Sequence, residues 1–150
     1  MYRFLIFIIA ILAIVAGYFA FQKTTVQVFF NNSLLDPEFS CDKVFPVDRR
    51  VIRMKAVEKA ALEELLKGPT EQERKAGFFT NINEGVKIEG LSIKGGVAKI
   101  EFDEQLEFQV GGSCRVAAIR AQITETLKQF LPVEEVLISI NGRTEDVLQP

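Results

Sequence analysis

The chain has 150 residues, enough for one domain and a short additional segment, and 48% of them are hydrophobic and 25% charged, as in a globular protein. A net charge of −2 argues against a broad surface for nucleic acid, which needs many exposed cations. The lack of histidine excludes Ser–His and Cys–His nucleophile pairs and the most common transition-metal ligand.

Residues 1–23 are predicted to anchor the chain in a membrane. Apolar residues run from Phe4 to Phe21, and about twenty helical residues span the hydrocarbon core of a bilayer. A retained transmembrane helix is expected, which crosses the cell membrane once and leaves residues 24–150 on the extracytoplasmic side. The alternative is a signal peptide cleaved near Ala16–Gly17, which would release a secreted domain.

Two extended segments, joined by a loop, follow the apolar run. Apolar residues alternate from Thr24 to Phe30, which predicts a strand. Asn31–Asn32–Ser33 is typical of a turn, and Leu34 to Cys41 is predicted to be a loop. Val44 to Arg53 is predicted to be a second strand, and Pro46 indicates that it begins at a sheet edge.

A helix and a shorter helical turn come next. Lys55 to Lys67 is predicted to be helical, because its apolar residues share one face. These residues are Val57, Ala61, Leu62, Leu65 and Leu66. Gly68–Pro69 ends the helix, and Thr70 followed by Glu73 is the pattern of a capping box. Residues 77–85 are predicted to form a loop.

A hairpin is predicted around Gly95–Gly96, two residues that tolerate positive φ. Its arms are Val86 to Lys94 and Val97 to Asp103. Gly90 interrupts the alternation of the first arm, and an isolated glycine in a strand indicates a β-bulge. We therefore expect a bulged antiparallel pair here.

The segment from Ser113 to Gly142 is predicted to supply the centre of the core. Cys114 to Phe130 forms a helix, with Ser113 as its N-cap and Pro132 after its end. Its apolar stripe consists of Val116, Ile119, Ile123, Leu127 and Phe130. Its polar back consists of Arg120, Gln122, Glu125 and Lys128. Val136 to Ile140 is predicted to be a mostly buried final strand.

The predicted element order is strand, strand, helix, hairpin, helix, strand. Antiparallel strands interrupted by two helices are typical of an α+β fold. We expect a two-layer sandwich, in which one mainly antiparallel sheet carries both helices on one face. This domain occupies residues 24–150.

Two groups of charged residues are candidate sites. Basic residues gather near the second strand: Arg49, Arg50, Arg53, Lys55 and Lys59. They indicate either a solvated rim or a patch for acidic lipid or another polyanion. Acidic residues follow the hairpin: Glu101, Asp103, Glu104 and Glu107. An exposed edge is the preferred interpretation, because catalytic carboxylate pairs need an apolar pocket and calcium loops need closer spacing with glycine. No catalytic residue, metal ligand or cofactor is assigned.

Cys41 and Cys114 are the only cysteines and are predicted to form a disulfide. Their count is even, the predicted anchor places them outside the cytoplasm, and both lie where a loop meets an element. Their Cα atoms must then lie within about 7 Å of each other. The alternatives are two unrelated thiols, or a reactive Cys114 at a helix N-terminus, although no Cys-x-x-Cys motif is present.

Four pieces of the sequence together resemble the GerMN domain family. They are Val26 to Phe30 with the later Val47 to Val51, Ala61 to Thr70 with Glu73, Ile93 to Phe102, and Ile123 to Gly142. The match covers nearly everything after the predicted anchor, in a single copy. It departs from the family at Ile82–Asn83–Glu84–Gly85 and in the length of the loop that bears Cys41. The resemblance implies a fold like the ring-building motifs of secretion systems, and it implies no catalytic residues.

These observations favour a non-enzymatic module of the bacterial cell envelope. It would be held at the membrane by its N-terminal helix and would bind other envelope proteins or self-associate, through exposed strand edges. The alternative is a domain that binds a small ligand or glycan with Phe78, Phe79 and the acidic edge. Burial of both phenylalanines would weaken that alternative.

Overall fold

The computed structural model describes residues 6, 8, 11, 23–52 and 56–149. The predicted anchor, residues 1–23, lies outside the described residues except at positions 6, 8, 11 and 23. Among the helices of the described ranges, none combines the length and the apolar character that crossing a membrane requires.

The described residues form two separate sheets of three strands each. The first sheet has the order β2-β1-β3, all antiparallel, with β1 (Lys23–Asn32), β2 (Phe45–Ile52) and β3 (Phe78–Phe79). The second sheet has the order β4-β5-β6, with β4 (Ile88–Lys94), β5 (Val97–Phe102) and β6 (Glu135–Ile140). The α+β class and the mainly antiparallel pairing are confirmed. The prediction of a single sheet is wrong.

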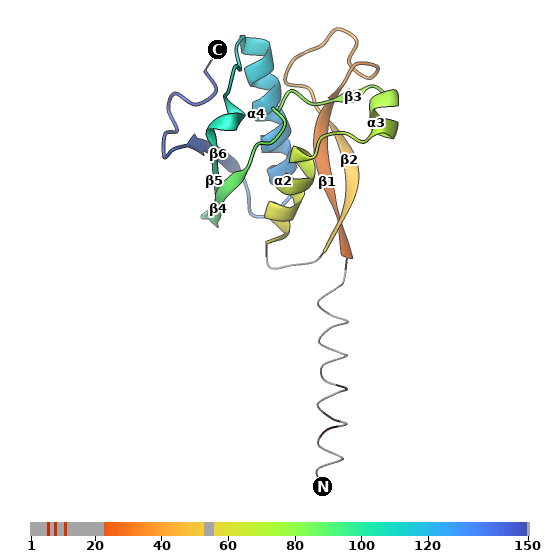
Figure 1. The fold of residues 1–150 in the computed structure, drawn as a ribbon, viewed down its shortest axis with the longest axis vertical. Coiled ribbons are helices and arrows are strands. Elements are labelled where there is room, and N and C mark those ends of the chain that lie inside the picture. The colour runs from red at the N-terminus through yellow and green to blue at the C-terminus, as the bar shows by residue number, and fades with distance from the viewer. Residues whose placement is uncertain (1–5, 7, 9–10, 12–22, 53–55, 150) are drawn as a thin grey trace.

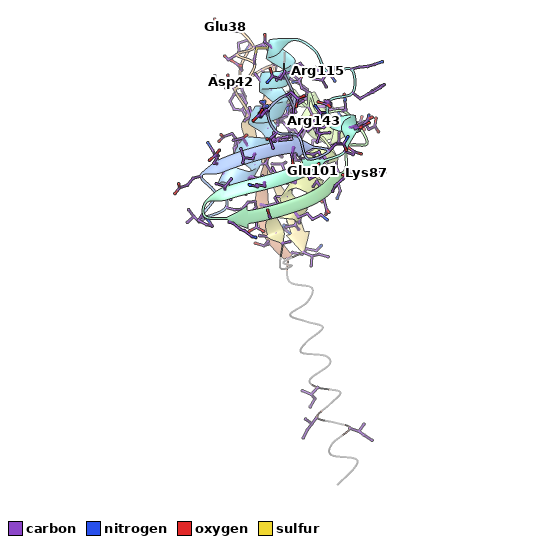
Figure 2. All side chains as sticks on the ribbon, turned by 90° about the vertical axis from the view of Figure 1, so that its left-hand side faces the viewer. Glu38, Asp42, Lys87, Glu101, Arg115 and Arg143 are labelled. Carbon is purple, nitrogen blue, oxygen red and sulfur yellow. A yellow bond between two sulfur atoms is a disulfide. The ribbon has the colours of Figure 1, made fainter. Side chains whose placement is uncertain are left out.

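The two longest helices of the described domain lie between the sheets, so they do not share one face of a single sheet (Figure 1). Helix α4 (Ser113–Lys128) packs against β1, β6 and α2 (Val57–Leu66), and α2 packs against β1 and β2. Figure 2 shows the second sheet with its outer face toward the viewer. The helices therefore bury apolar side chains toward both sheets.

Helix α4 explains why the strands divide into two sheets. The side-chain amide of Gln129 accepts a hydrogen bond from the N–H of Gln27 at 2.7 Å and donates one to the C=O of Gln27 at 2.6 Å. The hydroxyl of Thr126 accepts a hydrogen bond from the N–H of Phe29 at 3.1 Å. These side chains satisfy the backbone groups on the edge of β1 that a further strand would otherwise pair. The second hairpin therefore forms a sheet of its own.

Strands β5 and β6 pair in parallel, from Val97 with Glu135 to Phe102 with Ile140. Parallel neighbours need a long crossover connection, and α4 supplies it. The β4–β5 pair is antiparallel and has a register shift between Ile88 and Gly90, which confirms the predicted bulge.

The predicted apolar faces of the helices are confirmed. Helix α2 buries Ala61, Leu62 and Leu65, and α4 buries Val116, Ile119, Ile123 and Leu127. One continuous core joins all of these side chains except Ala61 to Val28 and Phe30 of β1 and to Ile100 and Phe102 of β5, and Ala61 packs with Val26 and Val51. The fold thus depends on helix faces that the 3.6-residue period already indicates.

Two helix caps differ in how well the sequence predicts them. The Thr70 hydroxyl accepts a hydrogen bond from the N–H of Glu73, and the Glu73 carboxylate accepts one from the N–H of Thr70, so α3 (Glu71–Lys75) has the predicted capping box. Ser113 is not the N-cap of α4, because Gly112 holds that position and Ser113 is already helical. Gly112 has a φ of 85°, which glycine adopts readily.

Candidate functional site: a disulfide-linked apolar loop

Residues 33–44 connect β1 to β2 at one end of the domain, and we call them the disulfide loop. Cys41 in this loop is bonded to Cys114 in the first turn of α4, with a Cα–Cα distance of 5.0 Å. This is the pairing that the sequence predicts, within the distance that a disulfide allows. The bond joins positions 73 residues apart and holds the disulfide loop against the helix.

Asn31, at the end of β1, holds the same loop from inside. Its side-chain amide donates hydrogen bonds to the carbonyls of Cys41 and Lys43, both at 3.0 Å. Its side-chain oxygen accepts hydrogen bonds from Asn81 at 3.1 Å and from Gln122 at 2.8 Å. Asn31 is almost completely buried, so each of these polar groups depends on its partners rather than on water.

Gln122 completes this network from α4, and the prediction that it lies on a polar back of the helix is wrong. Its side chain is fully buried, and its oxygen accepts a hydrogen bond from the Thr80 hydroxyl at 2.7 Å. The Thr80 hydroxyl in turn accepts one from the N–H of Ile82 at 3.1 Å. Burial of a glutamine costs little here because the oxygen and the nitrogen of its side-chain amide both have hydrogen-bond partners.

Asn31 and Asn32 lie in strand β1, so the turn predicted at Asn31–Asn32–Ser33 begins later, at Ser33. Asn32 is also buried, and its side-chain oxygen accepts hydrogen bonds from the N–H groups of Leu34 and Leu35 at 2.8 and 3.0 Å. The alternation of inward residues from Val26 to Phe30 continues to Asn32, and this signal could have extended the predicted strand. Asparagine favours turns when its side chain bonds locally, as that of Asn32 does, whereas the side chain of Asn31 bonds to more distant residues.

Asp36 organises the middle of the disulfide loop. Its carboxylate accepts hydrogen bonds from the N–H of Ser40 at 2.7 Å and from the Ser40 hydroxyl at 3.0 Å, and the Lys43 ammonium lies 3.6 Å away. The Ser40 N–H, reinforced by the Ser40 hydroxyl and Lys43, lowers the pKa of Asp36 against the opposing effect of burial. The loop therefore has an ordered interior at neutral pH.

The outer surface of this ordered loop carries three large apolar side chains. Leu34 is 69% exposed, Leu35 56% and Phe39 37%. The rings of Phe39 and Phe79 are 5.6 Å apart, and they line a hollow of about 350 Å³ together with Pro37 and Asn81. The structure thus presents large apolar side chains to solvent on a segment that a disulfide and buried hydrogen bonds hold in place, which is typical of an interaction surface.

The acidic residues predicted as an exposed edge lie in β5 and in the 3₁₀ helix and loop that follow it. Most of them bond to residues in β6 or just after it. Glu101 accepts hydrogen bonds from the Ser139 hydroxyl and the N–H of Gly142, and these two donors lower its pKa. The remaining contacts are those of Glu104 with Asn141, Glu107 with Arg143, and Asp103 with the N–H of Lys87. All four carboxylates have partners within the domain, and of the four residues only Glu104 is exposed, so the predicted exposed edge is confirmed for Glu104 alone.

The predicted basic group does not form one patch among the described residues. Arg49 makes two hydrogen bonds to Glu73, at 2.6 and 2.7 Å, and this contact is the largest cause of the lowered pKa of Glu73. Arg50 is exposed, and Lys59 lies 3.9 Å from Glu63. Arg53 and Lys55 lie outside the described residues.

The described residues contain no group of three or more His, Cys, Asp or Glu side chains placed to hold a metal ion. Cys114 is disulfide-bonded, so it cannot serve as a free thiolate while that bond persists. The expectation that the chain has no catalytic residue stays a prediction.

Fold and surface together define an α+β domain of two sheets around a helical layer, with a covalently tied apolar loop at one end. Residues 27–146 match the Germane family, described as "Sporulation and spore germination". The chain therefore belongs to this family, whose domain is also called GerMN, and the resemblance drawn from the sequence is confirmed. The chain contains one copy of this domain.

Solved structures support the same assignment. The chain is similar to the tandem GerMN domains of the sporulation protein GerM from Bacillus subtilis, with 26% identity and a TM-score of 0.60, over 83% of this chain and 40% of that chain. It matches the first GerMN domain of GerM at 20% identity and a TM-score of 0.58, over 81% of this chain and 85% of that one.

A third solved structure, a candidate lipoprotein from Clostridium perfringens, matches at 14% identity and a TM-score of 0.51, over 81% of this chain and 76% of that one. At this identity, as for the first GerMN domain, the likeness concerns the fold alone. No curated protein matches the chain.

Proposed function

We propose that this chain is a non-enzymatic module of the cell envelope. Its N-terminal segment holds it at the membrane, its GerMN domain lies on the extracytoplasmic side, and its disulfide loop binds a protein partner or a second copy. Membership of a sporulation and germination family, likeness to a candidate lipoprotein and the Cys41–Cys114 bond support an envelope location.

The exposure of Leu34, Leu35 and Phe39 on an ordered loop is the observation that carries this proposal. Exposed apolar side chains on a flexible loop would lose conformational entropy when a partner binds. Here Asn31, Asp36 and the disulfide have already ordered the backbone that presents them. A preorganised apolar surface is therefore suited to binding another protein.

In-cell photo-cross-linking tests the proposal directly. A photoreactive amino acid at position 35 should give a discrete adduct, whose partner mass spectrometry identifies. Leu34→Glu placed beside this probe should abolish the same adduct, because a buried, unpaired carboxylate opposes association. A strictly monomeric chain that gives no adduct at position 35 would contradict the proposal.

The matched control places the same amino acid at Lys99. This residue is also exposed, but it lies on the outer face of the second sheet and away from the disulfide loop. An adduct with the same partner at both positions would show proximity in the membrane rather than recognition by the loop.

A second candidate function, binding of a small ligand or glycan, is favoured by the hollow of about 350 Å³ between Phe39 and Phe79. Phe78 and Phe79 are both half-buried, so their burial does not separate the two functions. Titration with a glycan panel, followed by the chemical shifts of Phe39 and Phe79, does separate them. Shifts that saturate with one glycan would favour the ligand-binding function.

A further inference from the structure

Several segments end together opposite the disulfide loop, and we call this end the base. Lys23 begins β1 and pairs in register with Ile52, the last residue of β2. Phe130, which follows α4, packs near these strand ends on Val26 and Val51. Figure 1 shows β1 and β2 ending at the lower pole of the domain, and the hairpin of the second sheet ending at the lower left, above them. The base is also the end at which the apolar residues 1–22 join the domain in sequence.

The turn of the second hairpin belongs to the base as well. The carbonyl of Gly96 accepts hydrogen bonds from the N–H groups of Glu134 and Glu135, at 2.7 and 3.1 Å. A side chain at Gly96 would lie 3.3 Å from the carbonyl of Pro132. Lys94, at the end of β4, is therefore close to the loop that carries Leu131.

The base exposes apolar side chains of its own. Leu131 is 96% exposed, and Ile52 is 39% exposed. The neighbouring Phe130 packs inward, so it fixes the loop from which Leu131 projects. A single exposed leucine is common on protein surfaces, so Leu131 indicates a binding surface only in combination with the charged residues around it.

These charges are predominantly basic. Lys23, Arg50, Lys94 and Lys128 are exposed at or near the base, and within the described ranges none of them forms an ion pair. Among the described residues, the acidic residues at this end are Glu58, Glu134 and Glu135. By contrast, Glu38 and Asp42 lie at the opposite end, at the top of Figure 2.

We propose that the base binds the surface of an anionic lipid bilayer, with Leu131 among the lipid headgroups and Lys23, Lys94 and Lys128 beside the lipid phosphates. An apolar side chain surrounded by cations is the combination that interfacial membrane contacts use. The inference rests on the proposed function in one respect, because the N-terminal segment brings the base to the membrane. The opposite end, with the disulfide loop, would then face away from the bilayer and remain open to a partner.

The full chain, reconstituted into vesicles, provides the test. Leu131→Cys introduces the only free thiol beside the native disulfide, and an environment-sensitive fluorophore on it reports burial in lipid. We expect its emission to shift to the blue and rise severalfold in vesicles of phosphatidylcholine and phosphatidylglycerol, relative to phosphatidylcholine alone. The rise should disappear in about 1 M salt, where the Debye length falls to about 3 Å.

Two variants make the test specific. Lys94→Glu combined with Lys128→Glu should remove the lipid-dependent rise, whereas Lys87→Glu should leave it unchanged, because Lys87 lies at the end of β4 away from the hairpin turn. The same fluorophore at position 35, in the disulfide loop, should give no lipid-dependent change.

The outcomes separate the inference from the proposed function. If the chain floats with both kinds of vesicle and the label at position 131 stays in water, the inference is overturned and anchoring stands. If it floats with neither, anchoring and the inference both fail. If it floats only with anionic vesicles and the label responds, the inference stands and a spanning anchor fails. A signal that rises with protein concentration without lipid would make the base an interface between copies and overturn the inference.

Discussion

The two ends of this domain expose apolar side chains on segments that are held in place by different interactions. At the disulfide end, Leu34, Leu35 and Phe39 lie on a loop that a covalent bond, buried asparagines and an aspartate carboxylate hold in place. At the base, Leu131 lies on a short loop that is held by the apolar packing of Phe130 and by backbone hydrogen bonds, among them that of the Val133 N–H with the Phe130 carbonyl at 2.8 Å. Glu38, Asp42 and the exposed Lys43 lie in the disulfide loop, whereas Lys23, Lys94 and Lys128 lie near the base together with Glu134 and Glu135.

This difference indicates how a small domain can have two exposed apolar surfaces that suit two different kinds of partner. An ordered backbone with polar internal support provides defined positions for the side chains of a protein partner. A single leucine among cations needs no defined geometry, because headgroups adapt to it. If this comparison is right, the interactions that hold one end in place should be largely independent of those that hold the other.

Removal of the disulfide should have the largest effect on stability, and its local effect should be confined to the disulfide end. Cys41→Ala with Cys114→Ala opens a link between positions 73 residues apart, and the chain-entropy model gives a loss of roughly 4 kcal/mol. Chemical denaturation measures this loss. Amide hydrogen exchange should accelerate in residues 33–44 through local opening, whereas the buried Val26 and Val51 should accelerate only as far as the loss of global stability requires. Extra local opening of equal size at both ends would show that they are coupled.

Truncation in the shared core should destabilise both ends together. Leu127→Ala or Ile123→Ala removes a fully buried side chain of α4, and such changes cost roughly 2–5 kcal/mol. Thermal melting should show one cooperative transition at lower temperature. Two resolved transitions would mean that the ends fold separately, and unchanged melting would contradict the burial of these residues.

Asn31→Ala should weaken the disulfide end from within. The change removes four hydrogen bonds and leaves the Gln122 amide without one of its partners. An unsatisfied buried polar group costs roughly 1–3 kcal/mol. The double variant Asn31→Ala with Gln122→Leu should be less destabilised than the sum of the two single variants, and strict additivity would show that the two residues do not act as one network.

Acid should destabilise the disulfide loop and the Arg49–Glu73 contact. Folding lowers the pKa values of Asp36 and Glu73. The two carboxylates therefore stabilise the folded state fully above their unfolded pKa values near 3.8 and 4.5, and this stabilisation is lost as the pH falls through their folded pKa values. Melting temperature measured from pH 7 down to pH 3 should fall below about pH 4.5. The melting temperature of Glu73→Gln should depend less on pH over this range. A pH dependence identical to that of the unaltered chain would contradict a contribution of Glu73 to the loss of stability in acid.

Leu131→Ser and Leu34→Ser should have the smallest effects on folding. Both side chains are largely exposed, and substitutions of this kind usually change stability by less than about 0.5 kcal/mol. Denaturation midpoints should match those of the unaltered chain. A larger loss at either position would show that its side chain supports the fold rather than an interaction.

Local signals in the sequence predict most elements of this fold correctly. The capping box of Thr70 and Glu73, the bulge at Gly90 and the apolar faces of both helices follow from bonds or periodicities within a few residues. The pairing of the cysteines is also predictable, because the two cysteines of this sequence allow one intramolecular bond. The family, too, is recognisable from ordered strings along the chain.

The tertiary structure decided the arrangement of these elements and the interior of the site. Gln129 and Thr126 occupy the edge of β1 and so divide the strands into two sheets, which no pattern within a strand indicates. Asn31 and Gln122, which sequence patterns place in a turn and on a polar helix face, are buried because they satisfy each other across 91 positions of the chain. Periodicity reports which residues avoid water, whereas partners for buried polar groups are set only when distant segments meet.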